Sequence, residues 1–284
     1  MNTPATDRPQ PAAAEPTNAD NTNPDAMTLD PMIHEPTRSA LPDGHGESTG
    51  HGEHGEHPAG EALAVAMKPL LRGWLHLVLA PLCLIGCLVL ALLADTTPAR
   101  VGALVLGATA TMLFGTSALY HRRYWSPRAD TILRRLDHSN IYLIIAGTYT
   151  PFALTLLAGR QRVSLLVIVW VGALLGVAFR TSWVHAPRWL YTPIYVALGW
   201  VAIFYAGPLH AAGGTLVMTL IATGGILYTL GAVVYGFKRP DPWPRVFGFH
   251  EIFHACTVAA FIAHFIAAMA SCSSRNRART AGQS

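Results

Sequence analysis

The sequence predicts an all-α integral membrane protein, a seven-transmembrane helix bundle preceded by a disordered N-terminal tail. Of its 284 residues, 51% are hydrophobic and 13% are charged. The apolar residues are gathered into blocks of about 17 to 22 residues, the length with which an α-helix crosses a bilayer. Helices satisfy their own backbone hydrogen bonds in lipid, so a helical bundle is the expected architecture.

Seven apolar blocks follow one another after Lys68, each long enough for one crossing. Pro151 in the third block and Pro193 in the fifth predict a kink or a helix end. Gly224 and Gly225 in the sixth predict close contact with another helix. The predicted spans cover residues 74–94, 101–121, 139–158, 163–179, 189–207, 215–236 and 250–270.

The chain changes character near residue 61. Residues 1–61 are rich in Pro, Ala, Asn, Asp, Gly and His without helical or strand periodicity, and they predict a disordered, acidic cytoplasmic tail. Residues 44–57 within it form a His/Glu/Gly tract, a composition that can hold transition metals loosely but is also typical of a solvated linker. Residues 62–271 form the predicted membrane domain, and residues 272–284 a short basic C-terminal tail.

Charge is distributed unevenly along the chain. Residues 1–61 carry 11 acidic and 2 basic side chains, whereas residues 62–284 carry 5 acidic and 18 basic ones. With seven spans, 12 Lys and Arg residues of the second part fall on the side of the N-terminus and 6 on the other side. The positive-inside rule therefore places the N-terminus in the cytoplasm and the C-terminus outside the plasma membrane. This account of the basic residues makes nucleic acid the less favoured partner.

The motif His250-Glu-Ile-Phe-His254 opens the last predicted span. Residues four apart lie on one face of a helix, so both imidazoles can bind one metal ion. H-E-x-x-H is also the zincin signature, in which the Glu acts as general base. A zincin-like protease would need a further ligand downstream, but no Asp or Glu follows Glu251. A third ligand from upstream is therefore expected.

Three upstream residues meet this pair at one membrane face. His121 ends the second predicted span and Asp137 precedes the third, so an odd number of spans brings both to the end where His250 and His254 lie. His121 would be the third nitrogen ligand, and three protein ligands are typical of a catalytic zinc site. Asp137 is expected to act as general base or to orient a ligand histidine. Ser117, one turn before His121, could hydrogen-bond Asp137, a water or a substrate carbonyl, or its own backbone.

The remaining histidines and the cysteines are expected to be structural. His264 lies ten residues beyond His254, about 15 Å along the helix, too far to share an ion; a hydrogen-bonded core position is favoured over a polar cavity lining. His138 is rotated about 100° from Asp137 and is expected to be structural or at the rim of the site. Interfacial positions are predicted for His76, His185 and His210, and a packing role for Cys83 and Cys87. The four cysteines, which include Cys256 and Cys272, are too few and too deep in apolar segments for a disulfide framework.

The ordered set of motifs resembles the haemolysin III group of the progestin and adiponectin receptor family of seven-helix proteins. The resemblance runs from about residue 67 to residue 270 and implies a zinc ion bound by three histidines, with an aspartate and a serine close to it. It also implies kinship with alkaline ceramidases, and hence hydrolysis of a lipid amide. The matching motifs are Ser117-Ala-Leu-Tyr-His121, Leu136-Asp137-His138-Ser139, Ile145-Ala-Gly-Thr-Tyr-Thr-Pro151 and His250-Glu-Ile-Phe-His254, with His264 beyond. The implied zinc ligands are His121, His250 and His254.

The leading prediction is a zinc-dependent hydrolase that acts on a lipid amide at the cytoplasmic leaflet, with Zn²⁺ as cofactor, Asp137 and Ser117 as catalytic residues, and a membrane lipid as substrate or ligand. One alternative is a non-catalytic receptor or membrane-homeostasis protein in which zinc only fastens the helices. Another is a cytolytic protein, as the family name suggests, although the sequence lacks the amphipathic strand set of a pore-forming barrel. A transporter would be expected to show broken helices in repeated halves, and only the Gly-Thr-Tyr-Thr-Pro stretch of the third span has this character.

Overall fold

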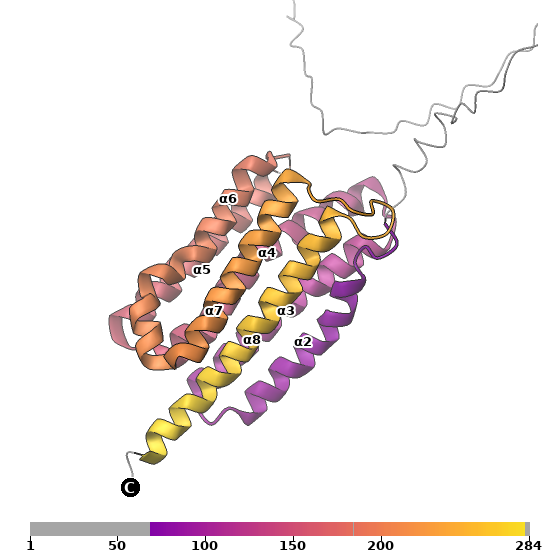
Figure 1. Ribbon diagram of the computed structural model, residues 1–284. Coiled ribbons are helices and arrows are strands. Elements are labelled where there is room, and N and C mark those ends of the chain that lie inside the picture. Colours follow the sequence, from indigo (N-terminus) through magenta and orange to yellow (C-terminus); the bar gives the residue numbers. More distant parts are fainter. Residues whose placement is uncertain (1–68, 184, 282–284) are drawn as a thin grey trace, which may run out of the picture. The chain divides into compact units, whose positions relative to one another are not determined.

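The computed structural model describes residues 69–183 and 185–281. The predicted disordered tail over residues 1–61 and its His/Glu/Gly tract lie outside these residues. In the described part, short connections join helices, and the β-type pairing is a single bridge between Trp243 and Phe247 (Figure 1). The helices are α2 (Trp74–Leu93), α3 (Thr97–Arg122), α4 (Pro127–Leu156), α5 (Gly159–Ser182), α6 (Arg188–Gly199), the 3-10 helix η1 (Trp200–Tyr205), α7 (Ala206–Phe237) and α8 (Phe249–Ala281).

Five helical segments are long and apolar enough to cross a membrane, which confirms a multi-pass membrane protein. Between 22% and 56% of the residues in their apolar windows are buried inside the protein. The rest of each apolar surface faces outward, as expected of helices whose solvent is lipid. The five segments are Trp74–Leu93, Thr97–Arg122, Gly159–Ser182, Arg188–Phe237 and Phe249–Cys272.

Helix α4 begins twelve residues before the predicted third span. The side chain of Ser126 caps its first turn by accepting a hydrogen bond from the Ala129 amide at 3.4 Å, and Pro127 occupies the first turn, where its missing N–H costs nothing. Pro151 lies inside α4 and Pro193 inside α6, so neither proline ends its helix. The alternative expectation that they mark helix ends is therefore wrong.

The helices pack mainly as sequential neighbours, α2 with α3, α3 with α4, α4 with α5, and α7 with α8. Helix α8 also contacts α2 and α4, so the last helix closes against the first (Figure 1). Gly224 on α7 permits the close approach of α7 to α8, because a Cβ atom there would collide with the His264 ring on α8. A Cβ on Gly225 would have no neighbour within 4 Å, so the predicted close contact is made by Gly224.

The segment before α2 is fastened to the loop before α8. The amide of Leu70 donates to the carbonyl of Arg245 at 3.1 Å, and the amide of Leu71 donates to the carbonyl of Val246 at 3.3 Å. These backbone bonds hold the first turns of α2 and α8 side by side at one end of the described helices. The histidines predicted to bind metal lie at the same end.

Candidate metal centre

Three histidines from two helices meet at this end. His121 lies in the last turn of α3, and His250 and His254 lie in the first turns of α8. Each offers one ring nitrogen, and the three nitrogens lie within 4.8 Å of one another. The Nε2 atoms of His121 and His250 are 3.3 Å apart. Two nitrogens that bind one tetrahedral zinc ion at about 2.0–2.1 Å are themselves about 3.3 Å apart, so the pair fits a shared ion.

The cluster is withdrawn from solvent. His121 is 8% exposed and His254 is 3% exposed. The rings of His121 and His250 meet edge to face with centroids 4.7 Å apart, and those of His250 and His254 lie 4.5 Å apart. Buried polar groups cost free energy unless they are paired or coordinated, and a common ion would engage all three rings. The cluster can therefore hold a metal ion.

Asp137 and Ser117 lie next to the cluster. The Oδ2 atom of Asp137 is 3.6 Å from Nε2 of His121, the nitrogen that also faces His250. Ser117 is buried one turn before His121 on α3, and both Ser117 and Asp137 line the cavity described below. The structure thus brings together all five residues named as candidates from the sequence.

Glu251 has a structural role at the start of α8. One carboxylate oxygen accepts a hydrogen bond from Nε of Arg72 at 2.6 Å, and the other accepts one from the Gly248 amide at 2.8 Å. A Glu at the third helical position that reaches back to the amide before the helix is one half of a capping box. Both carboxylate oxygens of Glu251 are therefore engaged, which argues further against a role as a zincin-type general base. At the same helix start, Asp241 accepts a hydrogen bond from the Phe249 amide at 2.9 Å and pairs a second free backbone donor.

His76 is buried in the site, so the prediction of an interfacial position is wrong. It lies in the first turn of α2 and is only 2% exposed. Its ring stacks on His254 with centroids 3.9 Å apart and an interplanar angle of 10°, and it meets Phe114 edge to face. Neither ring nitrogen has a hydrogen-bond partner among the described residues. The only sequence signal was its place one turn into the first span, at the same end as His121.

The other histidines follow expectation. The Nδ1 atom of His138 lies 2.8 Å from the Arg134 carbonyl and its Nε2 atom 3.3 Å from the Tyr235 hydroxyl, so its role is structural at the edge of the site. His264 is buried, with Nε2 3.1 Å from the Ile221 carbonyl, and it also lines the cavity described below, so both positions considered for it apply. His185 and His210 are exposed. The four cysteines are free, with Cys83 and Cys87 buried among apolar neighbours.

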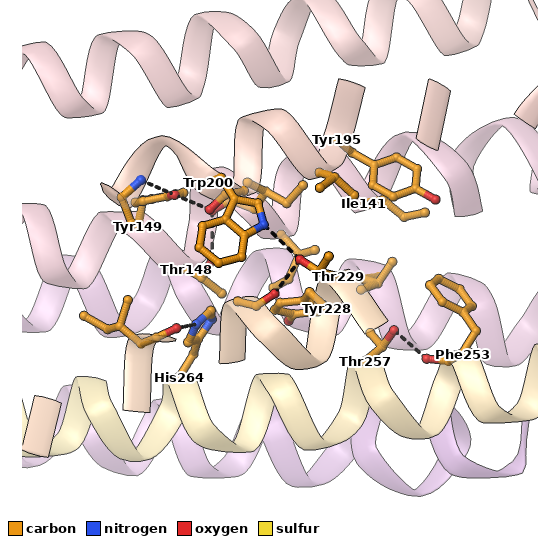
Figure 2. A pocket seen from close by; sticks show the side chains of 18 of the residues that line it. Ile141, Thr148, Tyr149, Tyr195, Trp200, Tyr228, Thr229, Phe253, Thr257 and His264 are labelled. Carbon is orange, nitrogen blue, oxygen red and sulfur yellow. Dashed lines mark hydrogen bonds between the residues drawn. The ribbon is translucent and has the colours of Figure 1, made fainter. Parts of the chain in front are cut away.

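A large apolar cavity extends from the histidine cluster into the protein. It has an empty volume of about 1410 Å³, counting the part that opens to the outside, and side chains of α2, α3, α4, α6, η1, α7 and α8 line it (Figure 2). His250 and His254 stand at one end of the lining and His264, ten residues further along α8, at the other. Its mostly apolar lining suits an apolar ligand whose polar end meets the histidines.

Comparison with known proteins agrees with these features. Residues 65–265 match the family model described as Haemolysin-III related, which covers well over half of the chain. The Hemolysin-3 homolog of Bacillus subtilis (strain 168) is 35% identical over 168 residues, or 59% of this chain and 76% of that protein. Hemolysin-3 of Bacillus cereus is 35% identical over 144 residues, or 51% and 65%. Heptahelical transmembrane protein ADIPOR2 of Oryza sativa subsp. japonica is 28% identical over 159 residues, or 50% and 69%. The chain therefore belongs to the haemolysin-III-related family of membrane proteins.

Proposed function

We propose that this protein is a zinc-dependent hydrolase that cleaves an amide bond in a membrane lipid at the cytoplasmic leaflet. One observation carries the proposal. Three histidines and the carboxylate of Asp137 stand together at one end of an apolar cavity, which offers a place for an acyl chain. Such a site combines groups that can act on a carbonyl with a space that selects lipid substrates.

His121, His250 and His254 would hold the ion. Imidazole nitrogens suit zinc among the divalent metals, and three protein ligands leave one position open for chemistry. A bound zinc ion supplies a Lewis acid for the substrate carbonyl and for a water molecule. Asp137, beside His121, is placed to receive the proton of the attacking water. Ser117, which lines the same space, can donate a hydrogen bond to the carbonyl oxygen.

The proposed reaction is balanced without another reactant. The oxygen of the water forms a bond with the carbonyl carbon, and its proton passes to Asp137. The carbon–nitrogen bond then breaks, and the proton leaves Asp137 for the departing amine. The fatty acid is released from the cavity side and the amine from the polar side. The cavity holds the acyl chain in place, which removes the entropy cost of aligning the two reactants in the reacting step.

Seven crossings account best for the helices. Helix α4 is the third crossing, since it packs between α3 and α5. The segment Arg188–Phe237 is two crossings, because 50 helical residues extend about 75 Å and the hydrocarbon core is about 30 Å thick. Gly214 has non-helical backbone angles (φ 75°, ψ 178°) that permit the chain to turn back within this segment. The distribution of Lys and Arg then favours a cytoplasmic N-terminus in the plasma membrane.

A receptor or homeostasis protein with a structural metal is the second candidate. One observation favours it. His121 and His250 are 129 residues apart in the chain and belong to different helices, so a shared ion would fasten α3 to α8. The ion pair between Arg72 and Glu251 fastens the segment before α2 to α8 at the same end. In that case the ion contributes stability and no turnover.

Metal analysis and activity together test the two candidates. Elemental analysis of the full-length protein in detergent should show one more zinc per chain than a His250→Ala/His254→Ala double variant, because the tail tract is present in both. Asp137→Asn should keep that zinc and lose hydrolysis of ceramide-like amides. Zinc without wild-type turnover would favour the structural candidate. An equal zinc content in the wild type and the double variant would exclude both the hydrolase and the structural-metal candidate.

A further inference from the structure

The end of the cavity far from the metal centre carries two polar atoms that the protein leaves unpaired. The hydroxyl of Tyr228 on α7 and Nδ1 of His264 on α8 are buried and have no hydrogen-bond partner among the described residues. His264 is 8% exposed, and the centroids of the two rings are 5.6 Å apart. Both residues line the cavity, and Figure 2 shows them on neighbouring helices. An unpaired buried polar group destabilises the folded protein, so a partner is expected there.

Apart from the metal centre and the unpaired His76 beside it, several polar side chains along the cavity are already paired. Thr148 donates to the Ile145 carbonyl at 2.8 Å, and Thr257 donates to the Phe253 carbonyl at 2.9 Å. The Trp200 indole donates to Thr229 at 2.9 Å (Figure 2). These groups present little unmet hydrogen-bonding capacity to a ligand. Tyr228 and His264 differ from them in kind.

The hydrogen-bonding character of the pair can be worked out. The Nε2 atom of His264 lies 3.1 Å from the Ile221 carbonyl, which can only accept, so Nε2 carries the hydrogen. In the neutral ring Nδ1 is then an acceptor, whereas the Tyr228 hydroxyl can donate or accept. Gly224 leaves room for the imidazole at this place, since the Cβ atom of any other residue would collide with the ring. The pair therefore offers one acceptor and one donor to the same region of an otherwise apolar space.

A hydroxyl group complements this pair. It can donate its hydrogen to Nδ1 of His264 and accept one from the hydroxyl of Tyr228, so that both orphan atoms gain a partner. A methylene group at the same place leaves both atoms unpaired. A site built around a hydrogen bond to a ligand hydroxyl discriminates strongly against the analogue that lacks it.

We propose that Tyr228 and His264 form a hydroxyl-recognition subsite, so that the preferred lipid carries a hydroxyl on its chain rather than being a plain hydrocarbon. The subsite lies ten residues along α8 from His254, which sets the polar head and the chain hydroxyl about 15 Å apart. The assignment of the head to the histidine cluster rests on the proposed function. The preference itself is a property of binding and needs no turnover.

A binding experiment tests the subsite with fatty acids, the acyl products of the proposed reaction. Stearic acid and a positional series of its monohydroxy derivatives displace a fluorescent fatty acid from the full-length protein in detergent. For wild type, one hydroxyl position should bind about 10-fold more tightly than stearic acid. Tyr228→Phe should reduce that preference, because one of the two hydrogen bonds to the ligand hydroxyl is lost, without weakening the binding of stearic acid. Thr257→Val is the matched control, because its hydroxyl lines the cavity but is already bonded to backbone, and it should keep the preference.

The result has clear contrary outcomes. Equal affinity of wild type for stearic acid and every derivative would overturn the proposal, and would indicate that water alone pairs the two atoms. A preference that is undiminished in Tyr228→Phe would overturn it as well. The hydrolase proposal fails on different evidence, the absence of amide hydrolysis by zinc-loaded wild type, which leaves a measured hydroxyl preference intact.

Discussion

His76 lies flat against His254 and has no polar partner among the described residues, so its contribution to the metal centre is one of shape. Loss of a residue that orients a metal ligand typically weakens metal binding 10- to 100-fold. We expect His76→Ala to weaken zinc binding about 10-fold by freeing the His254 ring, whereas His76→Phe, which keeps a flat ring, should cost much less. Competition with a zinc chelator measures both. Equal losses in the two variants would instead identify His76 as a nitrogen ligand.

Glu251 is predicted to stabilise the fold without binding the metal. Glu251→Gln removes the charge opposite Arg72, whose side chain is 22% exposed, and should lower the free energy of unfolding by about 2 kcal/mol while zinc content stays at the wild-type value. Thermal unfolding and elemental analysis of the same preparation check both parts. In an Arg72→Gln background the substitution should cost less, because the two residues are coupled. Loss of zinc in Glu251→Gln would contradict the structural role.

The sequence predicts some of these residues and misses others for a physical reason. The sequence predicts that four residues lie together, because each is near the end of a span and an odd number of spans determines which ends share a membrane face. These residues are His121, Asp137, His250 and His254. His76 could not be predicted in this way, because α2 is apolar on all sides and hydrophobic periodicity does not reveal which face turns inward. The rotation of such a helix is set by packing against its neighbours.

At the scale of helices, the sequence contains a start signal for α4, but a search based on hydropathy does not detect it. A Ser followed by a Pro, as at residues 126 and 127, is a helix-start signal. The polar first turns of α4 lie outside any apolar block, so a search for membrane spans begins too late. The predicted spans 189–207 and 215–236 divide the 50-residue apolar segment Arg188–Phe237, and Gly214, with its non-helical backbone angles, lies between them.

The contact between α7 and α8 yields a third prediction. Gly224→Ala should lower the free energy of unfolding by about 1–3 kcal/mol, because the new methyl group would displace the His264 ring. Gly225→Ala is the matched control on the same helix, since no atom lies within 4 Å of its Cβ position, and it should be neutral or mildly stabilising. Chemical or thermal unfolding in detergent compares them. Equal stability of the two variants would show that the helices separate at no cost.

For the whole molecule, composition establishes the class more firmly than the number of crossings. Helices with largely outward-facing apolar surfaces require lipid, whatever their count. The count depends on two segments that hydropathy alone does not resolve into single crossings. They are α4, whose first turns are polar, and the long apolar segment Arg188–Phe237. Seven crossings also bring the last turn of α3 and the first turns of α8 to the same face, which is where the histidine cluster lies. Topology and metal site therefore support each other.

The position of the two termini decides between an odd and an even number of crossings. With seven, a fluorescent protein fused to Met1 should fold in the cytoplasm and fluoresce, and alkaline phosphatase fused after Ser284 should be active, because it acquires its disulfides only outside. Moving the phosphatase to the loop at Pro240, between α7 and α8, should abolish its activity, since that loop is on the cytoplasmic side in this topology. An inactive fusion at Ser284 with an active one at Pro240 would place the C-terminus inside. If the Met1 fusion still fluoresced, the count would then be even, and the histidine cluster would face the outer leaflet, where a cytoplasmic lipid amide could not reach it.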